Sequence, residues 1–230
     1  MMPLSPFRRW MLGLCLLGAI VAMVLLQTVA GSPRNKANPA DMELTSGAVQ
    51  FRDLARANWA TLDGENKVKD YQALRLNLLL DSLLLVPSYV GLLILFTLAL
   101  GPSPQHAWLR QCLCVPAVAA GLFDLAENSM TGQALDDLLH RSLVDATVWD
   151  ITLASRLKWA LLALALLILT WRAWPGLTGI TRWLAMGAFG IGALSLWAGT
   201  GLISVPLLQT GLGFMSLGAL VLSLGLYRMR

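Results

Sequence analysis

Two carboxylates and an amide lie within one apolar segment of this chain. Asp124, Glu127 and Asn128 belong to residues 111–130, most of whose other side chains are apolar. Positions three and four apart share one face of a helix, so these three side chains are expected on the same face. An ionisable side chain at membrane depth costs roughly 2.5–3.5 kcal/mol on insertion scales and is by default a functional candidate. These residues therefore mark where a site is expected.

Two neighbouring apolar segments carry polar residues at comparable depth. At 1.5 Å per helical residue, Asp124 lies roughly 20 Å along its helix from Arg110, and Lys158 roughly 20 Å from Arg172. We therefore expect Lys158 to form an ion pair with Asp124 or Glu127. The residues predicted to surround a common polar pocket are Asn77, Asp81, Ser88, Asp124, Glu127, Asn128, Arg156 and Lys158.

This set of charges admits several kinds of chemistry. Two carboxylates and one ammonium leave one excess negative charge, which protonation, Arg156 or a bound cation can neutralise. The favoured hypothesis is a binding or accessory membrane protein whose outward-facing acidic pocket holds a cation or a lipid headgroup. The alternatives are a membrane-embedded enzyme acting on an amphiphilic substrate, with Asp124 and Glu127 as acid and base, and a proton-coupled transporter. A purely structural role, in which the polar groups hold helices together, also stays open.

Metal and cofactor chemistry is constrained by residue type. Asp81, Asp124 and Glu127 offer oxygen ligands that suit Mg²⁺ or Ca²⁺, and they are weak metal-site candidates. A zinc site is not expected, because His106 and His140 both lie outside the apolar segments. The chain shows no nucleotide-binding glycine motif, haem-ligand arrangement or nucleophile-elbow sequence in a suitable context. No catalytic residue is assigned, and whether the chain is an enzyme stays open.

The composition identifies the elements that must position these residues. The 230 residues are 57% hydrophobic and only 13% charged, whereas soluble domains have about 25% charged residues. Several apolar runs approach or exceed the ~18 residues of a spanning helix. The sequence therefore predicts an all-α membrane protein. The scattered Lys and Arg residues form no basic stripe, so the expected partners are the lipid bilayer and an amphiphilic ligand or membrane protein, not nucleic acid.

We predict a six-span transmembrane helical bundle with an extracytoplasmic helical loop. The predicted spans are residues 10–30, 76–100, 111–130, 151–171, 183–205 and 207–227. The predicted parts are a signal-anchor span (1–30), an extracytoplasmic loop with an amphipathic helix (31–75) and a five-span bundle (76–230). The alternative for residues 1–30 is a cleaved signal peptide.

Two segments outside the spans have amphipathic patterns. In the long loop, Ser46 is expected to cap a helix whose apolar face includes Val49, Leu54 and Ala55. The second helix is expected to continue beyond the membrane. Residues 133–150 are expected to form an amphipathic helical segment that lies on the outer interface with Trp149 as an anchor. This segment is either a cap over the polar cluster or an ordinary interfacial connector. Glycines repeating every seven residues in the last two spans predict close helix packing.

Charge distribution predicts the orientation. All 13 Asp and Glu residues lie between Asp41 and Asp150, whereas Arg residues without neighbouring acids flank the other segment ends. Positive charges near short loops favour the cytoplasmic side, so both termini are expected in the cytoplasm. The compactness of the chain suggests a bacterial protein, for which this membrane is the inner (plasma) membrane.

Overall fold

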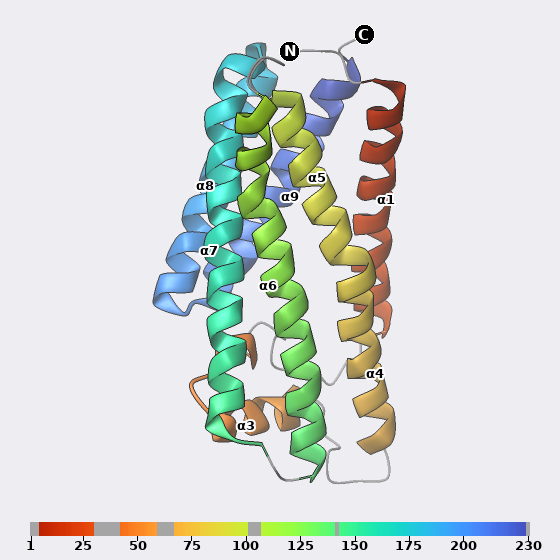
Figure 1. Cartoon of the computed structure of the whole chain (residues 1–230), viewed down its shortest axis with the longest axis vertical. Coiled ribbons are helices and arrows are strands. Elements are labelled where there is room, and N and C mark those ends of the chain that lie inside the picture. The colour runs from red at the N-terminus through yellow and green to blue at the C-terminus, as the bar shows by residue number, and fades with distance from the viewer. Residues whose placement is uncertain (1–4, 30–41, 59–66, 101–106, 141–142, 229–230) are drawn as a thin grey trace. The chain divides into compact units, whose positions relative to one another are not determined.

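The computed structural model describes residues 5–29, 42–58, 67–100, 107–140 and 143–228 (Figure 1). These residues form helices joined by short turns, with no β-strand among them. In chain order the elements are α1 (Pro6–Val29), α3 (Ala48–Asn58), α4 (Lys67–Leu80), the π-helical η1 (Asp81–Leu85), α5 (Val86–Leu100), α6 (Ala107–His140), α7 (Asp145–Gly176), α8 (Gly179–Leu202) and α9 (Val205–Arg228). The predicted all-helical fold class is confirmed.

Five of the described helical segments are long and apolar enough to cross a membrane. They are Pro6–Leu26, Leu74–Leu100, Asp145–Pro175, Gly179–Leu202 and Val205–Leu226. These segments agree with five of the six predicted spans and indicate an integral membrane protein. The remaining predicted span, residues 111–130, lies within α6, which is not among the five. Asp124 and Glu127 lower the apolar character of this helix.

Three continuous helical stretches are longer than a bilayer requires. α4, η1 and α5 follow one another without interruption over residues 67–100, and α6 and α7 have 34 and 32 residues. At 1.5 Å per residue each stretch is about 50 Å long, whereas the hydrocarbon core is about 30 Å thick. α1, α8 and α9, with 24 residues each, are about 36 Å long. Each of these three stretches is therefore longer than the thickness of the hydrocarbon core.

The prediction for residues 133–150 was wrong. These residues do not form a separate interfacial helix, because α6 continues to His140 and α7 begins at Asp145. The apolar side chains in this region pack inward, and Leu135, Leu143 and Val148 belong to a buried core. The amphipathic pattern therefore came from two helix ends that pack on a protein core, not on lipid.

A π-helical segment, η1, interrupts the continuous helix over residues 67–100 between α4 and α5. In η1 the Val86 amide donates to the Asp81 carbonyl, five residues earlier. Pro87 follows directly, and in a regular α-helix its ring would press against the carbonyl of Leu83. A wider turn before the proline relieves that contact. Single π-helical turns are frequent at functional sites, and this one begins at a predicted site residue.

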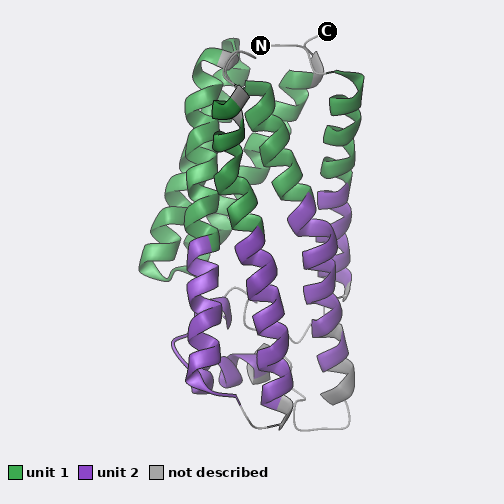
Figure 2. Ribbon diagram, in the orientation of Figure 1, with its two compact units in different colours: residues 1–17, 88–121, 158–230 green, residues 18–87, 122–157 purple. Residues whose placement is uncertain are grey.

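The chain divides into two compact units, which are coloured in Figure 2. Unit 1 comprises Met1–Leu17, Ser88–Gly121 and Lys158–Arg230, and unit 2 comprises Gly18–Pro87 and Leu122–Leu157. In unit 1, α8 and α9 form a close hairpin. A Cβ atom built on Gly211 would lie 2.6 Å from Leu196 Cγ and 3.0 Å from its backbone nitrogen. The predicted glycine packing is confirmed at this position.

In unit 2, α3 packs onto the halves of α4, α6 and α7 that belong to the same unit. Phe51 and Ala55 of α3 are buried in a core with Leu74, Ala134 and Ile151. A helix in the predicted loop is therefore confirmed. Of the three residues predicted on its apolar face, Ala55 is buried and Leu54 packs against this core, whereas Val49 is exposed.

The error in α3 has a tertiary origin. Val49 was expected on the apolar face, but 67% of it is exposed. Ser46 was expected to cap the helix, but the Ala48 amide donates to Asp145 Oδ1 at 2.7 Å instead. A carboxylate from α7 thus replaces the local cap. Phe51, three residues after Ala48, is completely buried in the core of unit 2.

Candidate functional site

A hydrogen bond between two predicted site residues joins η1 to α6 within unit 2. Asn128 Nδ2 donates to Asp81 Oδ2 at 2.6 Å and to Ser82 Oγ at 3.1 Å. Asp81 and Ser82 are the first two residues of η1. The altered turn thus presents a carboxylate and a hydroxyl to the same amide. Ser82 was not predicted, because one serine in an apolar run carries no distinguishing pattern.

The two intramembrane candidates Asp124 and Glu127 lie beside Asn128 on α6. Asp124 is 7% exposed and Glu127 only 2%. Each takes part in at least one polar or electrostatic interaction. Removing carboxylates from water costs several kcal/mol per ion unless partners compensate. We call Asp81 and Ser82 of η1, together with Asp124, Glu127 and Asn128 of α6, the α4–α6 polar cluster, because η1 directly continues α4.

The other predicted site residues are divided between the units. Asn77 is half-buried on α4, and half-buried Arg156 on α7 has an Nε atom that is buried without a hydrogen-bond acceptor in the described part of the chain. Ser88 and Lys158 are buried and belong to unit 1. Lys158 Nζ lies 4.5 Å from the centroid of the Trp159 ring. The ion pair of Lys158 with Asp124 or Glu127 stays a prediction.

Unit 2 also contains a carboxylate, Glu43, that was not among the predicted site residues. Ser155 of α7 is completely buried and donates to Glu43 Oε2 at 3.2 Å. Nearby, Thr152 Oγ1 donates to the Thr45 carbonyl at 2.7 Å. Glu43 follows a Pro- and Asn-containing stretch that had the composition of a linker. The signal that could have found it was the apolar pair Met42 and Leu44 on either side, both of which are buried.

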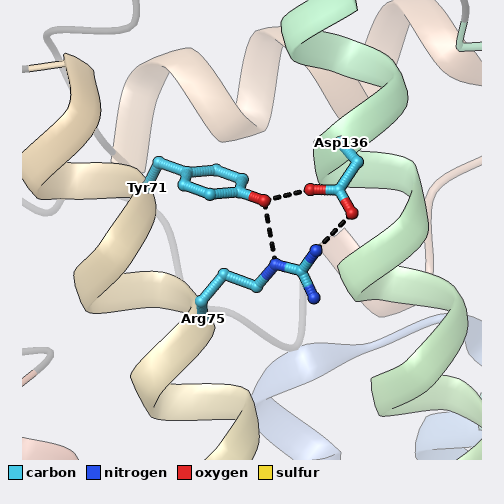
Figure 3. Close-up of polar contacts among 3 residues, drawn as sticks. All are labelled: Tyr71, Arg75 and Asp136. Carbon is cyan, nitrogen blue, oxygen red and sulfur yellow. Dashed lines mark hydrogen bonds and ion pairs between the residues drawn. The ribbon is translucent and has the colours of Figure 1, made fainter.

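A second polar connection joins α4 to α6 farther along the helices. The Tyr71 hydroxyl donates to Asp136 Oδ1, and Arg75 Nη2 donates to Asp136 Oδ2 (Figure 3). Arg75 Nε also donates to the Tyr71 oxygen at 2.9 Å. Because Arg75 and Asp136 remain substantially exposed, this ion pair alone stabilises the fold only modestly. It nevertheless fixes which turns of α4 and α6 face each other.

An apolar layer separates the α4–α6 polar cluster from α3. Leu74 and Leu78 precede Asp81 on α4, and Met130 and Ala134 follow Asn128 on α6, and all four pack in the core that contains Phe51 of α3. Ala134 lies six residues beyond Asn128, or about 9 Å along the helix. Water approaching along the bundle from the α3 end would have to cross this packed layer.

The described residues do not support the metal-site candidates. Among them, no three His, Cys, Asp or Glu side chains are arranged as ligands of one metal ion, and this includes Asp81, Asp124 and Glu127. The five long apolar helices indicate an integral membrane protein, and Asp124, Glu127 and Asn128 are buried on α6. No protein family, curated protein or solved structure matches the chain.

Proposed function

We propose that this chain is a six-span membrane protein whose α4–α6 polar cluster binds the headgroup of an amphiphilic molecule. The observation that carries the proposal is the hydrogen bond from Asn128 to Asp81 at the first residue of η1. It brings an apolar spanning segment and α6 together through their polar side chains. It also coincides with the one departure from α-helical geometry in residues 67–100, and such departures are frequent at functional sites.

The proposal takes α6 as the third span. Its length is sufficient, and polar partners on a neighbouring helix reduce the cost of placing carboxylates at membrane depth. The confinement of all acidic residues to positions 41–150 supports cytoplasmic termini, an extracytoplasmic loop over residues 31–75 and, in a bacterium, the inner membrane. In this arrangement the cluster lies in the outer half of the bilayer.

The chemistry of the cluster favours a ligand that donates hydrogen bonds. Its members are three carboxylates, one amide and one hydroxyl, and none of them is a cation. An ammonium headgroup matches this set, because it supplies three donors and a positive charge. Arg156, in the same unit, has a buried Nε–H group without an acceptor in the described part of the chain, and we propose that it pairs with an anionic part of the same headgroup. A zwitterionic aminophospholipid combines both features.

The route to the cluster also favours an amphiphile. The apolar core beneath α3 blocks approach along the helices from that end, whereas lipid reaches a bundle from its sides. A ligand with an apolar tail can enter between helices and leave its tail in the hydrocarbon. A free hydrophilic solute has no such advantage.

Native mass spectrometry with defined lipids tests the proposal. We expect the purified protein to retain phosphatidylethanolamine more strongly than phosphatidylcholine of the same acyl chains, because trimethylation removes the ammonium donors. Glu127→Gln should abolish this preference without lowering the amount of folded protein. The matched control is Asp150→Asn, which neutralises an exposed carboxylate of α7 in the same unit. Equal binding of the two lipids by the wild-type protein, or an unchanged preference in Glu127→Gln, would contradict headgroup binding at the cluster.

A further inference from the structure

The basic residues of unit 1 have no carboxylate side chain in their own unit. Residues 1–17, 88–121 and 158–230 contain eight Arg or Lys residues and no Asp or Glu. Arg172 interacts with the backbone instead: its Nε donates a hydrogen bond to the Leu100 carbonyl at 2.9 Å, at the end of α5. A membrane surface offers phosphate groups with which Arg and Lys side chains interact.

One arginine of unit 1 is held between two tryptophans. The Arg182 guanidinium carbon lies 5.2 Å from the Trp174 ring centroid and 5.7 Å from that of Trp183. The two rings are 5.5 Å apart and perpendicular. Arg182 Nη1 reaches the Trp174 carbonyl at 3.5 Å, whereas its Nε is buried and has no acceptor in the part of the chain that the structure describes.

The turn between α7 and α8 builds this arrangement. Trp174 lies in the last turn of α7, and Arg182 and Trp183 lie in the first turns of α8. Gly179 adopts a φ of 60°, which is favourable for glycine, and allows the chain to reverse within a few residues. Thr178 precedes α8 but makes no side-chain capping bond, so the first amides of α8 add positive potential near Arg182.

We propose that Arg182, Trp174 and Trp183 form a binding site for the phosphate group of an anionic lipid. The two tryptophans are half exposed, at 50% and 58%, as expected of side chains at a membrane–water interface. Ring contacts hold the guanidinium in one orientation, and its planar fork of donors matches phosphate oxygens. In the proposed topology this turn faces the cytoplasmic leaflet. The site is independent of the α4–α6 polar cluster, because it requires opposite charge and lies in the other unit.

The test uses variants of the full-length protein that either remove the charge of Arg182 or keep the charge and change the geometry of the site. Binding of phosphatidylglycerol relative to phosphatidylcholine is measured by native mass spectrometry for the wild type, Arg182→Gln, Arg182→Lys and Arg8→Gln. Arg8 is the control, because it is an arginine of the same unit near the proposed cytoplasmic surface with no tryptophan ring contact in the described structure. One basic residue near an anionic surface changes affinity about fivefold. We expect Arg182→Gln to lower the affinity for phosphatidylglycerol by more than about fivefold. Arg8→Gln should lower it by about fivefold at most.

Arg182→Lys distinguishes a specific phosphate-binding geometry from non-specific electrostatic attraction to an anionic surface. Lysine keeps the charge but lacks the planar fork, so this variant should also lose the preference for phosphatidylglycerol. Trp183→Leu keeps Arg182 but removes one ring, and it should weaken binding if the rings position the guanidinium. The proposal is overturned if Arg182→Lys and Trp183→Leu both bind as the wild type does. It is also overturned if Arg8→Gln and Arg182→Gln lower the affinity for phosphatidylglycerol equally.

Discussion

Asn128 and Asp81 interact directly in the α4–α6 polar cluster, and a double-mutant cycle measures the strength of this interaction. Asn128→Ala removes the amide that donates to Asp81 Oδ2 at 2.6 Å and to Ser82 Oγ at 3.1 Å. A hydrogen bond to a charged group contributes about 1.5–3 kcal/mol in water-soluble proteins. Interhelical polar bonds in membranes average only about 0.6 kcal/mol, with a maximum near 1.7, because the unfolded helices find other partners.

These values set the expected magnitude. Asn128 is buried, Asp81 is half-buried and the acceptor is a carboxylate, so the pair should lie at the upper end of the membrane range. We expect a coupling free energy between Asn128→Ala and Asp81→Ala of about 1–2 kcal/mol. The assay is reversible unfolding in bicelles, with the free energy of unfolding obtained for the wild type, both single variants and the double variant.

Asn77→Ala is the matched control for this cycle. Asn77 is an amide one turn before Asp81, is also half-buried, and makes no hydrogen bond that the structure describes. Its effect should be additive with that of Asn128→Ala to within about 0.5 kcal/mol. A coupling below that limit for Asp81 and Asn128, or an equal coupling for Asn77 and Asn128, would refute a direct bond between α6 and η1.

Two further predictions concern topology and helix packing. A cysteine introduced at Asn38 should react with an impermeant thiol reagent in intact cells and one at Gly176 should not, because we propose that they lie on opposite sides of the membrane; the reverse pattern would invert the topology. Gly211→Leu should destabilise the protein by several kcal/mol, because even its Cβ would overlap Leu196 of α8, whereas Gly213→Leu should be nearly neutral, because open space surrounds that position. Thermal unfolding in detergent separates the two variants, and equal melting temperatures would contradict the hairpin packing.

The sequence predicted most of the helical spans, because long apolar runs are a strong local signal. Gly179–Leu202 and Val205–Leu226 lie within a few residues of the predicted fifth and sixth spans. The prediction for residues 133–150 was wrong because an amphipathic helix has the same sequence pattern whether lipid or protein covers its apolar face. In the structure, Leu135 and Val148 pack with Phe51 of α3, and no pattern within residues 133–150 could reveal that partner.

The site was predictable in part, for a related reason. Asp81 and Asn128 stood out because polar side chains in apolar runs are costly. Glu43 did not stand out, because an acidic residue in a loop carries no such cost until tertiary packing buries its partner Ser155. The π-helical turn was also beyond local reasoning. Pro87 predicts a disturbance of the helix, but no local pattern predicts that it takes the form of a π-helical segment beginning at Asp81.

The most direct test of headgroup binding is a structure in lipid. The protein would be placed in nanodiscs made from a native membrane extract, with a bound antibody fragment to allow cryo-electron microscopy of so small a chain. We predict non-protein density with a headgroup in contact with Asp124 or Glu127 and a tail that extends between helices into the bilayer. Density of that shape should be lost in Glu127→Gln. A cluster closed entirely by protein side chains in both structures would show that these polar residues only hold helices together.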